Sequence, residues 1–274
     1  MDNVIKFETL TSRFYRYADQ VMRSEMYRNR AMQLGLVESS IKQDLQQQTL
    51  HIVQAVSSLN YSNNMMTSVR SASMRAAEWI MRDPIIDFLD PHWDLKDVGH
   101  IMTIAKRGQS ICAAAFSIDE LFHGIHRQTT VDVFNEETMQ SYAGEMSITS
   151  AYYCTSSMLV TDRSLQDTVA VNRNSSSSAK NKVKFLSAIL HEETHAAEEI
   201  LHRKNTLGDL MRPSEHSDAE LASAQMSLSR NGLVRTVNRD IYRQLPSERL
   251  ARIAQSTFEK RVVAGFLEHK FKIA

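Results

Sequence analysis

The residues with the clearest capacity for chemistry are two histidines and a glutamate in the segment Ile189-Leu190-His191-Glu192-Glu193-Thr194-His195. His191 and His195 are four positions apart, so a helix presents both imidazoles on one face, close enough to bind one metal ion. Glu192 then lies about 100° round the helix, beside the ion, where it is better placed to hold the metal's water than to be a ligand. The spacing predicts a zinc site in which Glu192 takes a proton from the water.

The residues around this motif predict that its helix is buried. An amphipathic helix is expected over about 179–203, ended by Asn205 and Gly208, with apolar positions at Phe185, Leu186, Ile189, Leu190, Ile200 and Leu201. With 10 histidines in the chain, an accidental match to HExxH is expected in roughly a few per cent of cases. The alternative is a surface helix whose His and Glu side chains only contact solvent or neighbours.

A catalytic zinc site needs a third protein ligand, and the residues just after the motif do not supply one. His202 is seven residues after His195, which places it about 10 Å further along the same helix. Glu198 and Glu199 also lie further along the helix than a ligand to the same ion should, although by less than His202. They are expected to support a ligand or lie at the surface. The Gly and third His that metzincins carry soon after the motif are also absent.

The next segment resembles the gluzincin branch of the zincin metallopeptidases. After a turn at 211–213 comes a predicted helix that starts Ser214-Glu215-His216-Ser217-Asp218-Ala219-Glu220 and runs to about Arg230. Gluzincins bring a Glu ligand from such a following helix, and an acid one turn later supports a ligand His. His216 and Glu220 occupy this ligand-then-acid spacing, although the family has Glu where this chain has His.

The resemblance implies one Zn²⁺ per chain, held by His191, His195 and His216, with Glu192 as the general base. Three other residues stay open as third ligand: Glu215, Glu220 and Asp218. Tyr152, Tyr153 and Tyr242 are candidates for stabilising the oxyanion, although each is more often an ordinary core aromatic. The expected function is a zinc metallopeptidase acting on a peptide or protein substrate.

The elements expected before the motif also follow the zincin order of helix, small sheet and active-site helix. An apolar pattern predicts a helix from about Gly99 to His126, and β-branched or aromatic residues predict strands at 129–134, 151–154 and 157–161. Residues 172–178 are expected to form a loop. The predicted fold class is mainly α with a small β-sheet: a helical region over 1–95, broken near 60–64, and a zincin-like domain over 96–274.

Two other function classes fit parts of the sequence. Glu120/His123 and Glu192/His195 are both Glu-x-x-His pairs, as in ferritin-like di-iron proteins. The β-like segments and the unexplained His191 count against that interpretation. A non-enzymatic helical scaffold is the other alternative, and the N-terminal helices could bind a protein partner.

Composition narrows the partners and the compartment. Lys plus Arg equal Asp plus Glu at 32 each, so the formal net charge is zero. The chain as a whole therefore has no positive electrostatic potential that would attract nucleic acid. No apolar run reaches membrane-spanning length, and the first residues lack a classical signal. Cys112 and Cys154 are expected to be reduced thiols. A cytoplasmic protein is predicted, or one exported by a route without a classical signal peptide.

Overall fold

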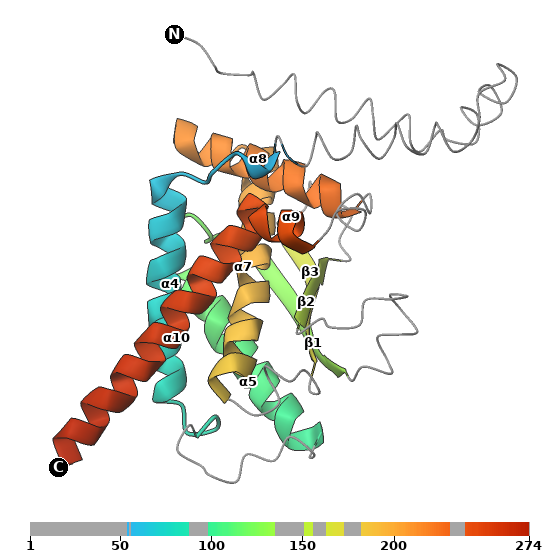
Figure 1. The fold of residues 1–274 in the computed structure, drawn as a ribbon. Helices are drawn as coiled ribbons and strands as arrows, with labels where there is room; N and C mark the ends of the chain where they lie inside the picture. Colours follow the sequence, from blue (N-terminus) through green and yellow to red (C-terminus); the bar gives the residue numbers. More distant parts are fainter. Residues whose placement is uncertain are drawn as a thin grey trace, which may run out of the picture. The chain divides into compact units, whose positions relative to one another are not determined.

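The computed structural model describes residues 54, 56–87, 98–134, 151–155, 163–172, 182–230 and 239–273. Its elements are labelled in Figure 1 and are α4 (Asn63–Met81), α5 (Val98–Ser117), β1 (His126–Phe134), β2 (Ala151–Thr155), β3 (Ser164–Asn172), α7 (Lys182–Leu207), α8 (Pro213–Arg230), α9 (Arg239–Gln244) and α10 (Pro246–Ile273). The described residues are mainly helical with a small sheet, which confirms the predicted combination of many helices with a small β-sheet. Within these ranges no helix is both long and apolar enough to cross a membrane.

The chain divides into two compact units, each made of two separate segments. The larger unit holds Tyr61–Ala219 and Arg249–Ala274, and the smaller holds Met1–Asn60 and Glu220–Glu248. α10 is one continuous helix whose first residues, Pro246–Glu248, are assigned to the smaller unit. The predicted boundary near residue 95, the N-terminal helices before residue 54 and the predicted strand at 157–161 lie outside the described residues.

The sheet has the strand order β1-β3-β2, with β1 parallel and β2 antiparallel to β3. Along β3, Leu165, Asp167 and Val169 are buried while Gln166 is exposed, the period of two expected when one face packs on a core. α5 contacts β1, and α7 contacts β2 and β3. Two helices therefore cover one face of the sheet (Figure 1). The opposite face carries the exposed residues Gln128, Thr130, Asp132 and Gln166.

α7 is positioned by close packing against α5 and by polar contacts with α10. A Cβ on Gly108 of α5 would lie 2.6 Å from Leu186 Cδ2, so any larger residue there would force the Leu186 side chain to move. Lys184 Nζ lies 2.6 Å from Glu259 Oε2, and Gln255 Nε2 donates to Ser187 Oγ at 3.2 Å. Since later residues of α7 pair with earlier residues of α10, the two helices run antiparallel.

The helix ends near the motif follow known capping rules and largely match the predictions. α7 ends before Gly208, whose φ of 75° is the left-handed conformation of a helix C-cap. α8 begins at Pro213, and Glu215 Oε2 accepts the backbone N–H of Arg212 at 3.2 Å, as in one half of a capping box. α4 begins after Ser62, whose side chain accepts from Met65 N, which confirms the predicted break near 60–64.

One predicted helix end was wrong. α5 stops at Ser117 instead of continuing to His126. Asp119 Oδ1 accepts the backbone N–H of Leu121 at 3.0 Å, so a side-chain turn replaces the next helical turn. Gly124, with φ of 96°, then leads the chain into β1.

Candidate metal centre

The two motif histidines lie side by side on the helix that the sequence predicts for them. Their ring centroids are 5.1 Å apart and the rings are inclined by 78°. Both side chains are partly exposed, whereas almost every other residue from Phe185 to Leu201 is buried. α7 therefore presents two imidazoles at one accessible spot on an otherwise buried surface.

The structure brings Glu248, in the first turn of α10, to this pair. One ligand atom from each of His191, His195 and Glu248 lies within 4.8 Å of the others. Glu248 is 4% exposed, and the hydroxyl of Tyr242 donates to its Oε1. A carboxylate in a first helical turn is also favoured by the positive end of the helix dipole.

The predicted third ligand lies elsewhere. His216 is exposed, and its Nδ1 lies 2.7 Å from Asn205 Oδ1. In the part of the chain that the structure describes, no metal-binding group includes His216 or any of its three rivals. Glu215 caps α8, Glu220 is exposed, and Asp218 accepts from Ser62 N at 2.7 Å.

Glu192 is buried and is not one of the three clustered residues. It follows His191 directly and therefore projects from α7 at about 100° to that imidazole. The general-base role of Glu192 stays a prediction.

Behind the motif, a buried ion cluster ties α7 to α5 and the sheet. Glu193 Oε2 accepts from Arg127 Nη1 at 2.6 Å, and Glu193 Oε1 accepts from Gln109 Nε2 at 3.0 Å. Arg127 also binds Asp167 at 2.6 Å. Burial alone would lower the pKa of Arg127, but the charges of Glu193 and Asp167 raise it above its ordinary value. The guanidinium is therefore a permanent cation between two buried carboxylates.

Tyr153, one of the oxyanion candidates, lies beside this cluster. Its hydroxyl is buried and has no hydrogen-bond partner. Burial, followed by the nearby charge of Asp167, raises its pKa well above the ordinary value. The side chain therefore stays a neutral phenol. Tyr242 contacts the candidate ligand Glu248 instead, and the Tyr152 side chain lies outside the described residues.

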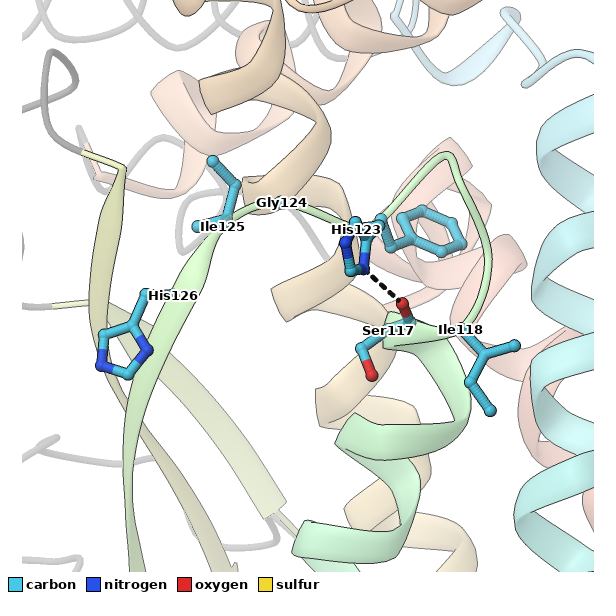
Figure 2. A pocket seen from close by; sticks show the side chains of 7 residues that line it. Ser117, Ile118, His123, Gly124, Ile125 and His126 are labelled. Carbon is cyan, nitrogen blue, oxygen red and sulfur yellow. Dashed lines mark hydrogen bonds between the residues drawn. The ribbon is translucent and has the colours of Figure 1, made fainter.

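The second Glu-x-x-His pair is not part of the group formed by His191, His195 and Glu248. Glu120 and His123 are exposed in the turn after α5, beside a cavity of about 600 Å³ lined by Ser117, Ile118, Phe122, His123, Gly124, Ile125 and His126. Figure 2 shows the His123 ring at the end of α5, where its Nδ1 lies 3.1 Å from the Ser117 carbonyl, with His126 pointing away from it. Nothing in this geometry favours the di-iron alternative.

Comparisons of the chain with protein-family models, with curated proteins and with solved structures find no match. The site must therefore be classed by its own donors, which are two imidazoles and one carboxylate. This is the ligand set of one class of catalytic zinc site.

Proposed function

We propose that the chain is a zinc-dependent hydrolase, and specifically a peptidase, in which His191, His195 and Glu248 hold one zinc ion. The proposal rests on one observation: the ligand atoms of His191, His195 and Glu248 lie within 4.8 Å of one another. It replaces the sequence-based expectation of a third histidine with a carboxylate. A Glu ligand from a later helix agrees with the gluzincin pattern in residue type, whereas His216 agrees with it in distance along the chain.

The donor set suits a catalytic ion. Zinc accepts imidazole nitrogen and carboxylate oxygen, and three protein ligands leave a fourth position for water or substrate. The two histidines are partly exposed, so water and a substrate carbonyl can reach them. A bound zinc ion would polarise the carbonyl and lower the pKa of the attacking water.

Glu192 supplies the proton transfer. It accepts a proton from the water as the water oxygen bonds to the amide carbon, and it returns that proton to the nitrogen as the carbon–nitrogen bond breaks. Its burial limits competing contacts with bulk water. The products are a free carboxylate and a free amine.

A peptide substrate is supported by the gluzincin resemblance and by the sheet. Zincins hold an extended substrate along an edge strand close to the active-site helix. Among the described residues, β2 is at the end of the strand order β1-β3-β2, is antiparallel to β3 and contacts α7. An edge strand has backbone N–H and C=O groups on its outer side that can pair with a peptide.

The test combines elemental analysis with cleavage of a proteome-derived peptide mixture, read by mass spectrometry. We expect one zinc per chain in the wild type and its loss in His191→Ala and Glu248→Ala. Glu192→Gln should keep the zinc and lose about 10²- to 10⁴-fold in cleavage rate.

His216→Ala is the matched control, because it removes an exposed imidazole outside the cluster. It should keep both zinc and activity. Zinc retained in Glu248→Ala but lost in His216→Ala would return the third ligand to α8. Zinc without cleavage would leave a structural metal site, and no zinc under replete conditions would leave a helical interaction protein.

A further inference from the structure

One ring nitrogen of His195 has a specific acidic neighbour. His195 Nδ1 lies 3.0 Å from Glu198 Oε2, one turn later on α7. Glu198 is 3% exposed, and a carboxylate can only accept here, so the bond requires a proton on Nδ1. The Nε2 lone pair is then left for a metal ion.

Glu198 is itself held by a residue from a distant part of the chain. The hydroxyl of Tyr61, 5% exposed, donates to the other carboxylate oxygen, Oε1. Both oxygens of Glu198 therefore have defined donors, which restricts rotation of the carboxylate. His195, Glu198 and Tyr61 form a chain of hydrogen bonds that leads from the metal face of α7 to the start of α4.

The next residue ties the same segment to α8. Ser62 N and Ser62 Oγ donate to Asp218 at 2.7 and 2.5 Å, and Ser62 also caps α4. Tyr61 and Ser62 thus connect α4, α7 and α8 through side chains that are buried or partly buried. Because α4 continues directly from Ser62, the Tyr61 hydroxyl is held in place by the fold and not by one side chain alone.

We propose that Glu198 and Tyr61 are positioning residues that fix the tautomer and orientation of His195, so that metal affinity depends on the Tyr61–Ser62 segment. The inference rests on the proposed zinc site and deepens it. Partners of this kind typically change metal affinity by about 10- to 100-fold when they are removed. Neither residue touches the ion or the substrate.

The experiment measures the affinity of the full chain for Zn²⁺ alone by competition with a chromophoric chelator. Glu198→Ala should weaken binding by about 10- to 100-fold, Glu198→Gln by less because an acceptor oxygen remains, and Tyr61→Phe by about tenfold. Tyr153→Phe is the matched control. It also removes one buried hydroxyl, but one without a hydrogen-bond partner, so zinc affinity should be unchanged.

Two further readouts separate positioning from general stability. The Co²⁺ absorption spectrum should change in Glu198→Ala but not in Tyr153→Phe, since only the first alters a ligand's orientation. In the wild type, ¹⁵N NMR of the zinc-loaded protein should show His195 protonated at Nδ1 and bonded to the metal through Nε2. This last measurement needs no variant to fold.

The outcomes distinguish the two proposals. Wild-type zinc affinity in both Glu198→Ala and Tyr61→Phe, with zinc lost in His191→Ala, would overturn the positioning role and leave the zinc site standing. An equal loss of affinity in Tyr153→Phe, or zinc bound to Nδ1 of His195, would also overturn it. Absence of zinc binding in the wild type would overturn both.

Discussion

Replacing Arg127 with Met tests whether the buried ion cluster supports the motif helix. Met keeps most of the side-chain volume but removes the guanidinium that contacts Glu193 at 2.6 Å and Asp167 at 2.6 Å. Both carboxylate side chains are 0% exposed. The variant therefore leaves two buried anions without the cation that lies between them.

The expected loss is large for a single substitution. Removing one partner of a buried ion pair typically costs about 3–5 kcal/mol, because an uncompensated charge stays buried. For a protein of this size, 1 kcal/mol shifts the melting temperature by about 2–4 °C. Arg127→Met should therefore lower the melting temperature by roughly 6–20 °C.

Thermal and urea denaturation measure this loss, and Arg163→Met is the control. Arg163 pairs with Asp209 at 2.8 Å, but its side chain is 60% exposed, and exposed pairs contribute about 0–1 kcal/mol. Adding Glu193→Gln and Asp167→Asn to Arg127→Met should recover part of the loss, since the buried charges disappear with their partner. A loss under about 1 kcal/mol in Arg127→Met, or no recovery in the triple variant, would refute the account.

Three other results are expected. Zinc at about 100 times its dissociation constant should stabilise the fold by about 2.7 kcal/mol in a thermal scan, and Glu248→Gln should remove most of this gain. Burial acts to raise the pKa of Asp83, but the hydrogen bond from Arg107 and two backbone N–H groups lower it below 3.8. A lowered folded-state pKa gives stability above the unfolded value that is lost as pH falls through the folded value. Arg107→Gln should thus cost at most about 1 kcal/mol at pH 7 and nothing in strong acid, as measured by urea denaturation. Gly108→Ala should destabilise by about 1–2 kcal/mol despite its better helix propensity, because its Cβ would meet the fully buried Leu186.

The parts of the fold that the sequence predicted well are those with local signals. The apolar spacing in α7, Gly208 after it and Pro213 at the start of α8 each act within a few residues. β1 and β2 were found because β-branched and aromatic residues dominate them. Such signals need no knowledge of what the element packs against.

β3 was missed for a reason that its burial explains. Asp167 lies at an inward position between Leu165 and Val169, where an alternating strand should have an apolar residue. The charge is accommodated only because Arg127 on β1 and Glu193 on α7 complete the ion cluster. A buried ion pair between distant segments thus hides the strand from a pattern search.

The candidate third ligand shows the same limit more sharply. The search from sequence looked within the next helix, because short connections usually bring successive elements together. Glu248, the carboxylate that the structure groups with the two histidines, instead lies in the first turn of α10, 53 residues after His195 along the chain. The HExxH spacing rules used for the sequence do not point that far. Such a residue could be located only from three-dimensional coordinates.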